Sequence, residues 1–197
     1  MTVKSELSRS KILTAALSVL ESDGARALTL DKVASKAEVS KGGLTHHFKS
    51  KQELLLGVFD LVVVSMKSRT EALLLEEPDD GRPGRFTRAY IRANLECIQC
   101  GEAESMRALL EMLVAEPGLS ALRRADILGL HERLESDGLN PIHALALASA
   151  SDGCWTDVLL GFCDANDPKI ALVHEHLIAL SRHSMLTPEQ PLPEISR

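Results

Sequence analysis

Apolar residues recur at helical spacing along most of the 197-residue chain. The first such stripe occupies residues 9–22, where apolar side chains repeat every three to four positions on one face. Alternating runs typical of strands are scarce, so the pattern predicts an all-α fold. The polar residues 1–8 are expected to precede its first helix. Further stripes predict helices at residues 51–75, 86–100, 102–115, 119–136, 142–162 and 169–185.

Two shorter helices, joined by a tight turn, are predicted before residue 51. Thr29 is placed to cap the first and Ser40 the second, because hydroxyl oxygens accept hydrogen bonds from the amides at a helix start. Ser50 and Glu53 have the spacing of a capping box, which predicts that the long helix begins directly after Ser50. The chain therefore contains about nine helices, with a helix-turn-helix ahead of the fourth.

Charge is distributed unevenly along the chain. The net charge is -6, yet residues 1–57 hold nine Lys/Arg against six Asp/Glu, and the remainder holds thirteen against twenty-two. The basic end coincides with the helix-turn-helix, as expected for a DNA-binding unit joined to an acidic partner domain. A chance asymmetry of charge is the alternative.

The second short helix carries small and polar residues near its start. The two glycines would let the backbone approach closely, and the lysine and polar side chains could reach phosphates or base edges in a major groove. These residues are Lys41, Gly42, Gly43, Thr45 and His46.

The same segment resembles the signature of the tetracycline-repressor (TetR) family of bacterial transcription regulators, over about the first quarter of the chain. The matching pattern is Val33-Ala34-x-x-Ala37-x-Val39-Ser40, then Lys41-Gly42-x-Leu44-x-His46-x-Phe48-x-Ser50-Lys51-x-x-Leu54. Thr45 and His47 stand where the family commonly has aromatic residues, and Glu38 stands where glycine is usual in the turn. A left-handed conformation at Glu38 would cost conformational free energy.

The resemblance implies which side chains contact DNA. The start of the long helix also favours an anion at Lys51, because its backbone amides point outward. We expect Ser40, Lys41, Gly42, Gly43, Thr45 and His46 near the bases, and Thr29, His47 and Lys51 at phosphates.

The resemblance also implies a small-molecule effector pocket among the helices that follow the DNA-binding unit. Large or adaptable side chains there are the candidates for its lining, although plain core packing is the alternative for each. The candidates are Met66, Tyr90, Met112 and Trp155.

The last two long helices form the predicted dimer contact. Asn140-Pro141 and Asp167-Pro168 have the residue types of a helix cap followed by a first helical position. The helix at 142–162 is rich in Ala, Ser and Gly and is apolar on more than one face, so we expect a second copy to cover part of it. The resemblance implies the same homodimer.

The sequence divides into three predicted parts: a DNA-binding domain at 1–50, an effector-binding and dimerisation domain at 51–186, and a flexible tail at 187–197. With no signal peptide and no long apolar run, we expect a cytoplasmic protein with free thiols and no membrane partner. No nucleophile elbow, phosphate loop or zinc motif is present, so the sequence predicts neither an enzyme nor a cofactor or metal site.

These patterns and the resemblance to the TetR family together imply a homodimeric repressor that a small molecule releases from a palindromic operator. One alternative is an all-α enzyme or ligand carrier without operator specificity. Another is a redox-sensing regulator that uses Cys97 and Cys100, which share a helix face, although two buried thiols are the simpler interpretation. A stripe of Arg85, Arg88 and Arg92 could bind an anionic ligand or pair with an acidic neighbour.

Overall fold

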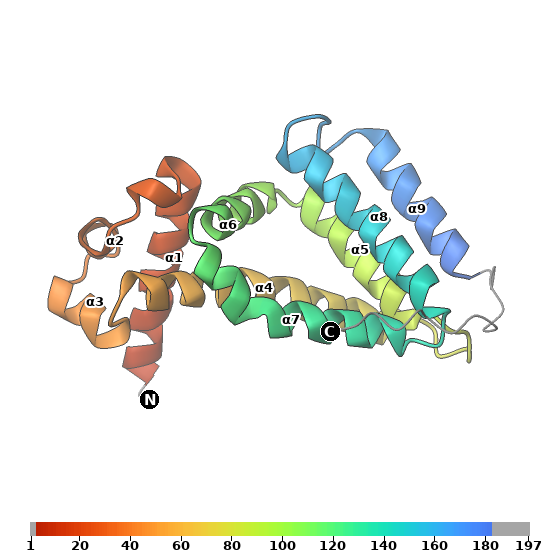
Figure 1. Ribbon diagram of the computed structural model, residues 1–197, viewed down its shortest axis with the longest axis horizontal. Coiled ribbons are helices and arrows are strands. Elements are labelled where there is room, and N and C mark those ends of the chain that lie inside the picture. The colour runs from red at the N-terminus through yellow and green to blue at the C-terminus, as the bar shows by residue number, and fades with distance from the viewer. Residues whose placement is uncertain (1–2, 183–197) are drawn as a thin grey trace. The chain divides into compact units, whose positions relative to one another are not determined.

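The computed structural model describes residues 3–182, and within this range every regular element is helical (Figure 1). The predicted all-α fold is confirmed. None of the described helices is long and apolar enough to cross a membrane. The elements are α1 (Val3–Asp23), the 3-10 helix η1 (Ala25–Ala27), α2 (Leu30–Lys36), α3 (Lys41–His47), α4 (Lys51–Glu76), α5 (Arg85–Gln99), α6 (Ala103–Ala115), α7 (Pro117–Glu135), α8 (Pro141–Leu159) and α9 (Pro168–Ser181).

Most helix boundaries lie within about three residues of the prediction, and two early starts have a physical reason. α1 begins at Val3, so the expectation that residues 1–8 precede the helix is wrong; no Gly or Pro interrupts this polar stretch. α7 begins at Pro117, because proline is tolerated at a first helical position. The predicted end of α9 at 185 and the tail at 187–197 lie outside the described residues.

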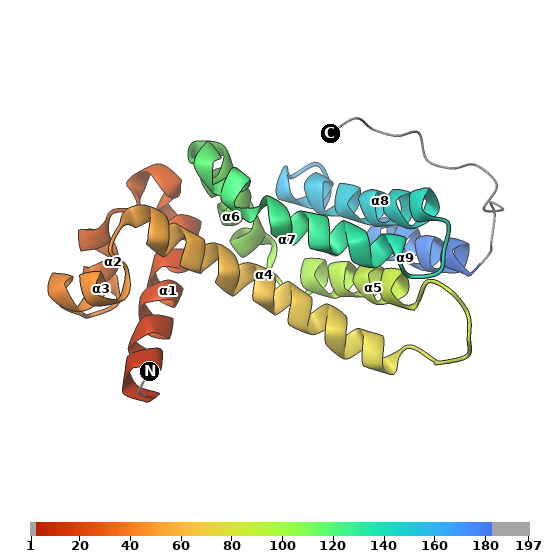
Figure 2. The same cartoon turned by 60° about the horizontal axis from the view of Figure 1, so that its bottom comes forward.

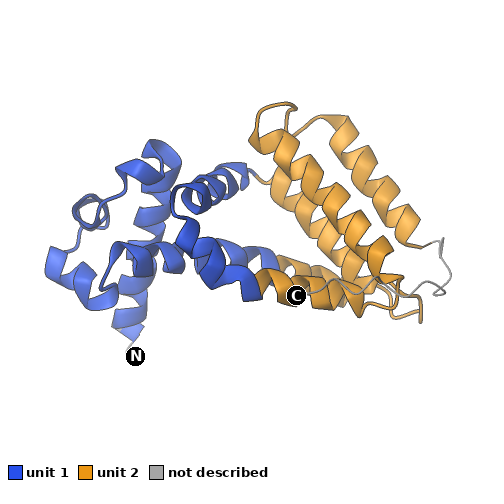
Figure 3. Cartoon of the chain, viewed as in Figure 1, with its two compact units in different colours: residues 1–68, 101–125 blue, residues 69–100, 126–197 orange. Residues whose placement is uncertain are grey.

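The chain forms two compact units, made of residues 1–68 and 101–125 (unit 1) and residues 69–100 and 126–197 (unit 2) (Figure 3). This division differs from the predicted domains at 1–50 and 51–186. The reason is α6, which packs against α1 through Ala108, Leu109 and Met112 and so completes the core of unit 1. α4 and α7 each contribute residues to both units.

The core of unit 1 holds α1, α2, α3 and the start of α4 together. Leu44 and Phe48 are fully buried at the end of α3 and pack into the same cluster as Leu13. Gly57 marks a close approach: a Cβ there would lie 2.8 Å from Leu13 Cδ2 and 3.0 Å from Phe48 Cε1. The helix-turn-helix is therefore fixed to the long helix by tight packing.

In unit 2, α5, α8 and α9 pack side by side (Figure 2). α5 has Gly84 at its N-cap, which supplies no capping side chain. Asp137, from the loop after α7, caps α5 instead: its carboxylate accepts from Phe86 N at 2.9 Å, Thr87 N at 2.7 Å and Thr87 Oγ1 at 2.8 Å. The predicted caps of α8 and α9 are confirmed, with Asn140 and Asp167 as acceptors.

The arginine stripe on α5 is paired with acidic residues at the end of α4. Arg88 Nε lies 2.8 Å from Glu77 Oε2, and their side chains are only 3% and 5% exposed. Arg92 contacts Glu77 and Glu76 at 3.3 and 3.1 Å. Arg85 donates to the Glu77 carbonyl at 3.0 Å. The stripe thus belongs to an ion-pair network within unit 2 in which the Arg88–Glu77 pair is buried and the other pairs are partly exposed, as the acidic-neighbour interpretation expects.

Candidate nucleic-acid interface

The two short helices start with the predicted caps. Thr29 Oγ1 accepts from Lys32 N at 3.2 Å, and Ser40 Oγ accepts from Gly43 N at 3.0 Å. Glu53 N donates to Ser50 Oγ at 3.1 Å, but the Glu53 carboxylate accepts from Lys49 N at 2.7 Å, one residue before the position that a capping box predicts. Local hydrogen bonds therefore define α2, α3 and α4 as separate helices.

The turn between α2 and α3 places Glu38 in the left-handed region, with φ 52°. A residue with a Cβ is disfavoured there, which explains why glycine would suit the position. The Lys11 ammonium lies 2.9 Å from Glu38 Oε2, and its hydrogen bond lowers the pKa of this carboxyl below its usual value. The Glu38 side chain thus has a partner on α1, while its backbone keeps the left-handed conformation of the turn.

α3 buries Leu44 and exposes Lys41, Gly42 and His46. A Cβ added at Gly42 would meet no atom within 4 Å, so the helix surface there is open. Thr45 is half-buried, and its hydroxyl donates to the Lys41 and Gly42 carbonyls at 3.0 and 3.2 Å. The start of α3 thus offers a small, polar surface to a partner.

The other predicted contacts are already engaged within the chain. The hydroxyls of Thr29 and Ser40 serve as caps, and the ring of half-buried His47 packs edge-on against His46 at 5.4 Å between centroids. Lys51 Nζ lies 3.5 Å from the Ala25 carbonyl oxygen and 3.5 Å from Glu116 Oε1. A DNA phosphate would have to share or displace these partners.

Three lysines of this region lie beside carboxylates that the sequence did not indicate. Lys41 Nζ lies 2.8 Å from Asp31 Oδ1, and Lys32 Nζ lies 3.0 Å from Asp23 Oδ2. The Lys51–Glu116 pair joins residues from α4 and the end of α6. Such partners come from different elements, so no short spacing in the sequence indicates them.

The effector candidates are divided between the two units. Met112 is fully buried in the core of unit 1, and Met66 is half-buried on α4 in the same unit. Tyr90 and Trp155 belong to unit 2, where both are buried. The structure therefore places only Tyr90 and Trp155 in the unit that holds α8 and α9.

Tyr90 is part of a polar network that the sequence did not indicate. Its hydroxyl donates to Asp152 Oδ1 at 2.8 Å, and Asn94 Nδ2 donates to the same oxygen at 2.9 Å and to Ser151 Oγ at 3.0 Å. Burial raises the pKa of Asp152 and, together with the Asp152 charge, that of Tyr90. Asn94 Oδ1 and the Trp155 indole Nε1 are buried and lack a hydrogen-bond partner among the described residues.

The cysteines divide by exposure. All four are free thiols, as expected. Cys97 is fully buried, but Cys100 is exposed at the end of α5, so the interpretation of both as buried is wrong for Cys100. Arg69 Nη1 donates to Cys100 Sγ at 3.4 Å. Cys100 is the residue that caps the end of α5, and its thiol donates to the Cys97 carbonyl at 3.5 Å.

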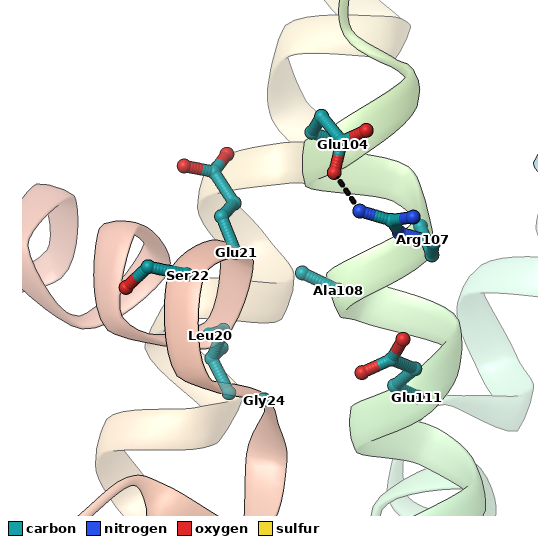
Figure 4. Close-up of a pocket in the computed structure, with 8 residues that line it drawn as sticks. All are labelled: Leu20, Glu21, Ser22, Gly24, Glu104, Arg107, Ala108 and Glu111. Carbon is teal, nitrogen blue, oxygen red and sulfur yellow. Dashed lines mark hydrogen bonds and ion pairs between the residues drawn. The ribbon is translucent and has the colours of Figure 1, made fainter.

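A cavity of about 290 Å³ lies between the end of α1 and α6 in unit 1 (Figure 4). Glu104 and Arg107 form an ion pair within it, and Ser105 Oγ donates to Glu21 Oε1 at 2.6 Å. The lining is polar and largely acidic, which suits neither an apolar ligand nor an anion. It consists of Leu20, Glu21, Ser22, Gly24, Glu104, Arg107, Ala108 and Glu111.

Two family descriptions match separate parts of the chain. "Bacterial regulatory proteins, tetR family" matches residues 12–58, which include the helix-turn-helix. "Tetracyclin repressor-like, C-terminal domain" matches residues 84–182, half of the chain. The chain belongs to the TetR family. The resemblance seen in the first quarter of the sequence is thereby confirmed and extends to the helices of unit 2.

Among the curated proteins similar to this chain, the nucleoid occlusion factor SlmA of Shewanella woodyi is 29% identical over 129 residues, covering 65% of this chain and 56% of that protein. The chain thus spans little more than half the length of this curated relative. A TetR-family member from Streptomyces coelicolor A3 has a TM-score of 0.70 at 23% identity, covering 88% of this chain and 97% of that one. The SmeT–triclosan complex has a TM-score of 0.67 at 20% identity, covering 95% and 100%. These structures share the fold.

Proposed function

We propose that this TetR-family chain is a homodimeric, DNA-binding transcription repressor that a small molecule releases from a palindromic operator in the cytoplasm. The observation that carries the DNA-binding part is the open surface at the start of α3, where Lys41, Gly42 and His46 are exposed on a helix capped by Ser40. Family and fold favour a regulator over the alternative of an all-α enzyme or ligand carrier.

Each subunit would place α3 in a major groove, with Ser40, Gly43 and Thr45 beside the exposed residues and with Thr29, His47 and Lys51 at phosphates. Successive major grooves on one face of B-DNA lie about 34–36 Å apart, so a two-fold dimer would bind two half-sites at that spacing. Selection of random duplex DNA by the purified protein, followed by sequencing, tests this arrangement. A recovered palindrome is expected, and a pool without enrichment would contradict operator binding.

Lys41→Ala should weaken binding to the selected operator. Loss of a base or phosphate contact is worth about 1 kcal/mol per subunit, which corresponds to roughly thirtyfold for a dimer. Fluorescence anisotropy at a fixed salt concentration measures the change. Lys67→Ala is the matched control, because it removes the same charge at a position away from α3. Lys67 lies about 24 Å along α4 from Lys51, the first residue of that helix. Equal losses in both variants would mean that net charge, rather than a contact, explains the effect.

The dimer part of the proposal is supported by the exposed apolar face of α8 and α9. Leu160 and Leu172 are each 61% exposed, and Ile142 and Val173 are also exposed. Small residues accompany them on α8, and a Cβ at Gly153 would meet no atom within 4 Å. A second copy of the chain would cover this face and form a four-helix contact.

Gly153→Glu should disrupt the dimer, because it would place a charge between closely packed α8 helices without any clash inside its own subunit. Gly129→Glu on α7 is the control, since a Cβ at Gly129 also meets no atom within 4 Å. Sedimentation velocity should show monomer for the first variant and dimer for the second. Dimers in both cases would place the interface elsewhere.

For the effector we propose a site in unit 2 beside Tyr90, Asp152 and Trp155, where buried polar groups and aromatic rings occur together. Met66 stays a candidate for the effector site, whereas Met112 is fully buried in the core of unit 1. The SmeT complex holds a small aromatic molecule, triclosan, on the same fold. Release from DNA requires that the effector prefer a conformation with lower operator affinity, and α4, which has residues in both units, is the proposed coupling element.

A further inference from the structure

Glu116 lies beside a lysine that the proposed function assigns to DNA. Its Oε1 atom is 3.5 Å from Lys51 Nζ, which is also 3.5 Å from the Ala25 carbonyl oxygen. Both side chains retain solvent access, at 37% exposure for Lys51 and 47% for Glu116. The pair joins the first residue of α4 to the residue that follows α6, all within unit 1.

The backbone fixes the position of Glu116. Its N–H donates to the Met112 carbonyl at 3.0 Å, and its carbonyl accepts from Leu119 N at 2.9 Å, so both peptide groups are held. Met112 and Leu119 are themselves fully buried in the core of unit 1. Tertiary packing therefore fixes the backbone from which the Glu116 side chain reaches Lys51, and the exposed ion pair itself is weak.

A phosphate and the Glu116 carboxylate require the same ammonium group. The start of α4 also presents backbone amides, which favour an anion at this position. The Glu116 carboxylate beside Lys51 offsets part of that positive potential, and the Ala25 carbonyl of η1 is a second partner of Nζ. Binding of a phosphate then has to displace Glu116 or accept its repulsion.

We propose that Glu116 is an intramolecular competitor of the operator phosphate for Lys51, an inference that rests on the proposed DNA-binding function. It is a positioning residue, because it acts on DNA through Lys51. Any movement that draws the end of α6 away from Lys51 would raise operator affinity in the same way as removing the charge of Glu116.

The test compares Glu116→Gln with Glu111→Gln on the selected operator at low salt. Both substitutions remove one negative charge from α6 or the residue that follows it. The two positions are about 7.5 Å apart along the helix axis. Exposed ion pairs are weak, so we expect a gain in affinity of about threefold per subunit, and about tenfold for a dimer, in Glu116→Gln beyond that in Glu111→Gln. The excess should shrink as salt is raised, because salt screens the pair.

The same pair of substitutions in a Lys51→Ala background decides between competition and a general charge effect. If Glu116 acts through Lys51, the excess gain disappears in that background. An excess that persists without Lys51, or equal gains in both glutamine variants, would overturn the inference. A Lys51→Ala protein that binds as tightly as the wild type would also overturn it, while Lys41→Ala tests the proposed function independently.

Discussion

Phe48→Ala should lower the free energy of unfolding of unit 1 by about 3–5 kcal/mol, as expected for removal of a fully buried aromatic ring. The side chain is 1% exposed and fills the space beside Gly57, which has no side chain of its own to occupy that space. The Arg9 guanidinium lies over the same ring, 5.2 Å from its centroid. Urea unfolding followed by far-UV circular dichroism measures the loss, and operator binding should fall with the folded fraction.

Phe162→Ala provides the matched control for this substitution. Phe162 is 75% exposed, so the same truncation there should change stability by less than about 0.5 kcal/mol. If the two variants unfolded at the same urea concentration, the core assignment of Phe48 would be wrong.

Glu77→Gln should destabilise unit 2 by about 3–5 kcal/mol, because it leaves the guanidinium of Arg88 buried without a countercharge. Arg88 is 3% exposed and would keep two neutral acceptors, the Pro83 carbonyl at 2.8 Å from Nη1 and the new amide oxygen, but no negative partner. The neighbouring Arg92 also loses one of its two carboxylate partners. Thermal and urea unfolding of the variant should both show the loss.

The adjacent residue supplies the control. Glu76 is 62% exposed and pairs with Arg92, so Glu76→Gln should cost less than about 1 kcal/mol. Replacing both buried charges, as in Glu77→Leu with Arg88→Met, should recover much of the lost stability, since no charge would then stay buried alone. A Glu77→Gln protein as stable as Glu76→Gln would show that water reaches Arg88 freely.

Local features of the fold are predictable from the sequence because their causes lie within a few residues. The caps at Thr29, Ser40 and Asn140 each involve a side chain and an amide two or three positions away. Helical periodicity likewise indicates most helices to within a turn. The start of α1 at Val3 is the exception, since a polar helix end carries no apolar stripe.

Contacts between distant elements are not predictable in this way. Asp137 caps α5 from 50 residues away, and Asp152 meets Tyr90 from 62 residues away. Likewise, Glu116, which follows α6, lies beside Lys51 at the start of α4. The side chains of the candidate site could be named from α3 alone, but their partners depend on how the helices pack.

The split composition of unit 1 limits how the parts of this chain can be exchanged between regulators. Leu109 and Met112 cover the helix-turn-helix core, yet they lie more than fifty residues beyond α3 in the sequence. A recombination event that transferred only residues 1–50 would bring α1, α2 and α3 into a new chain without the side chains that seal them. New operator specificity in this lineage is therefore expected to arise by substitutions on the surface of α3 more readily than by exchange of the whole N-terminal segment.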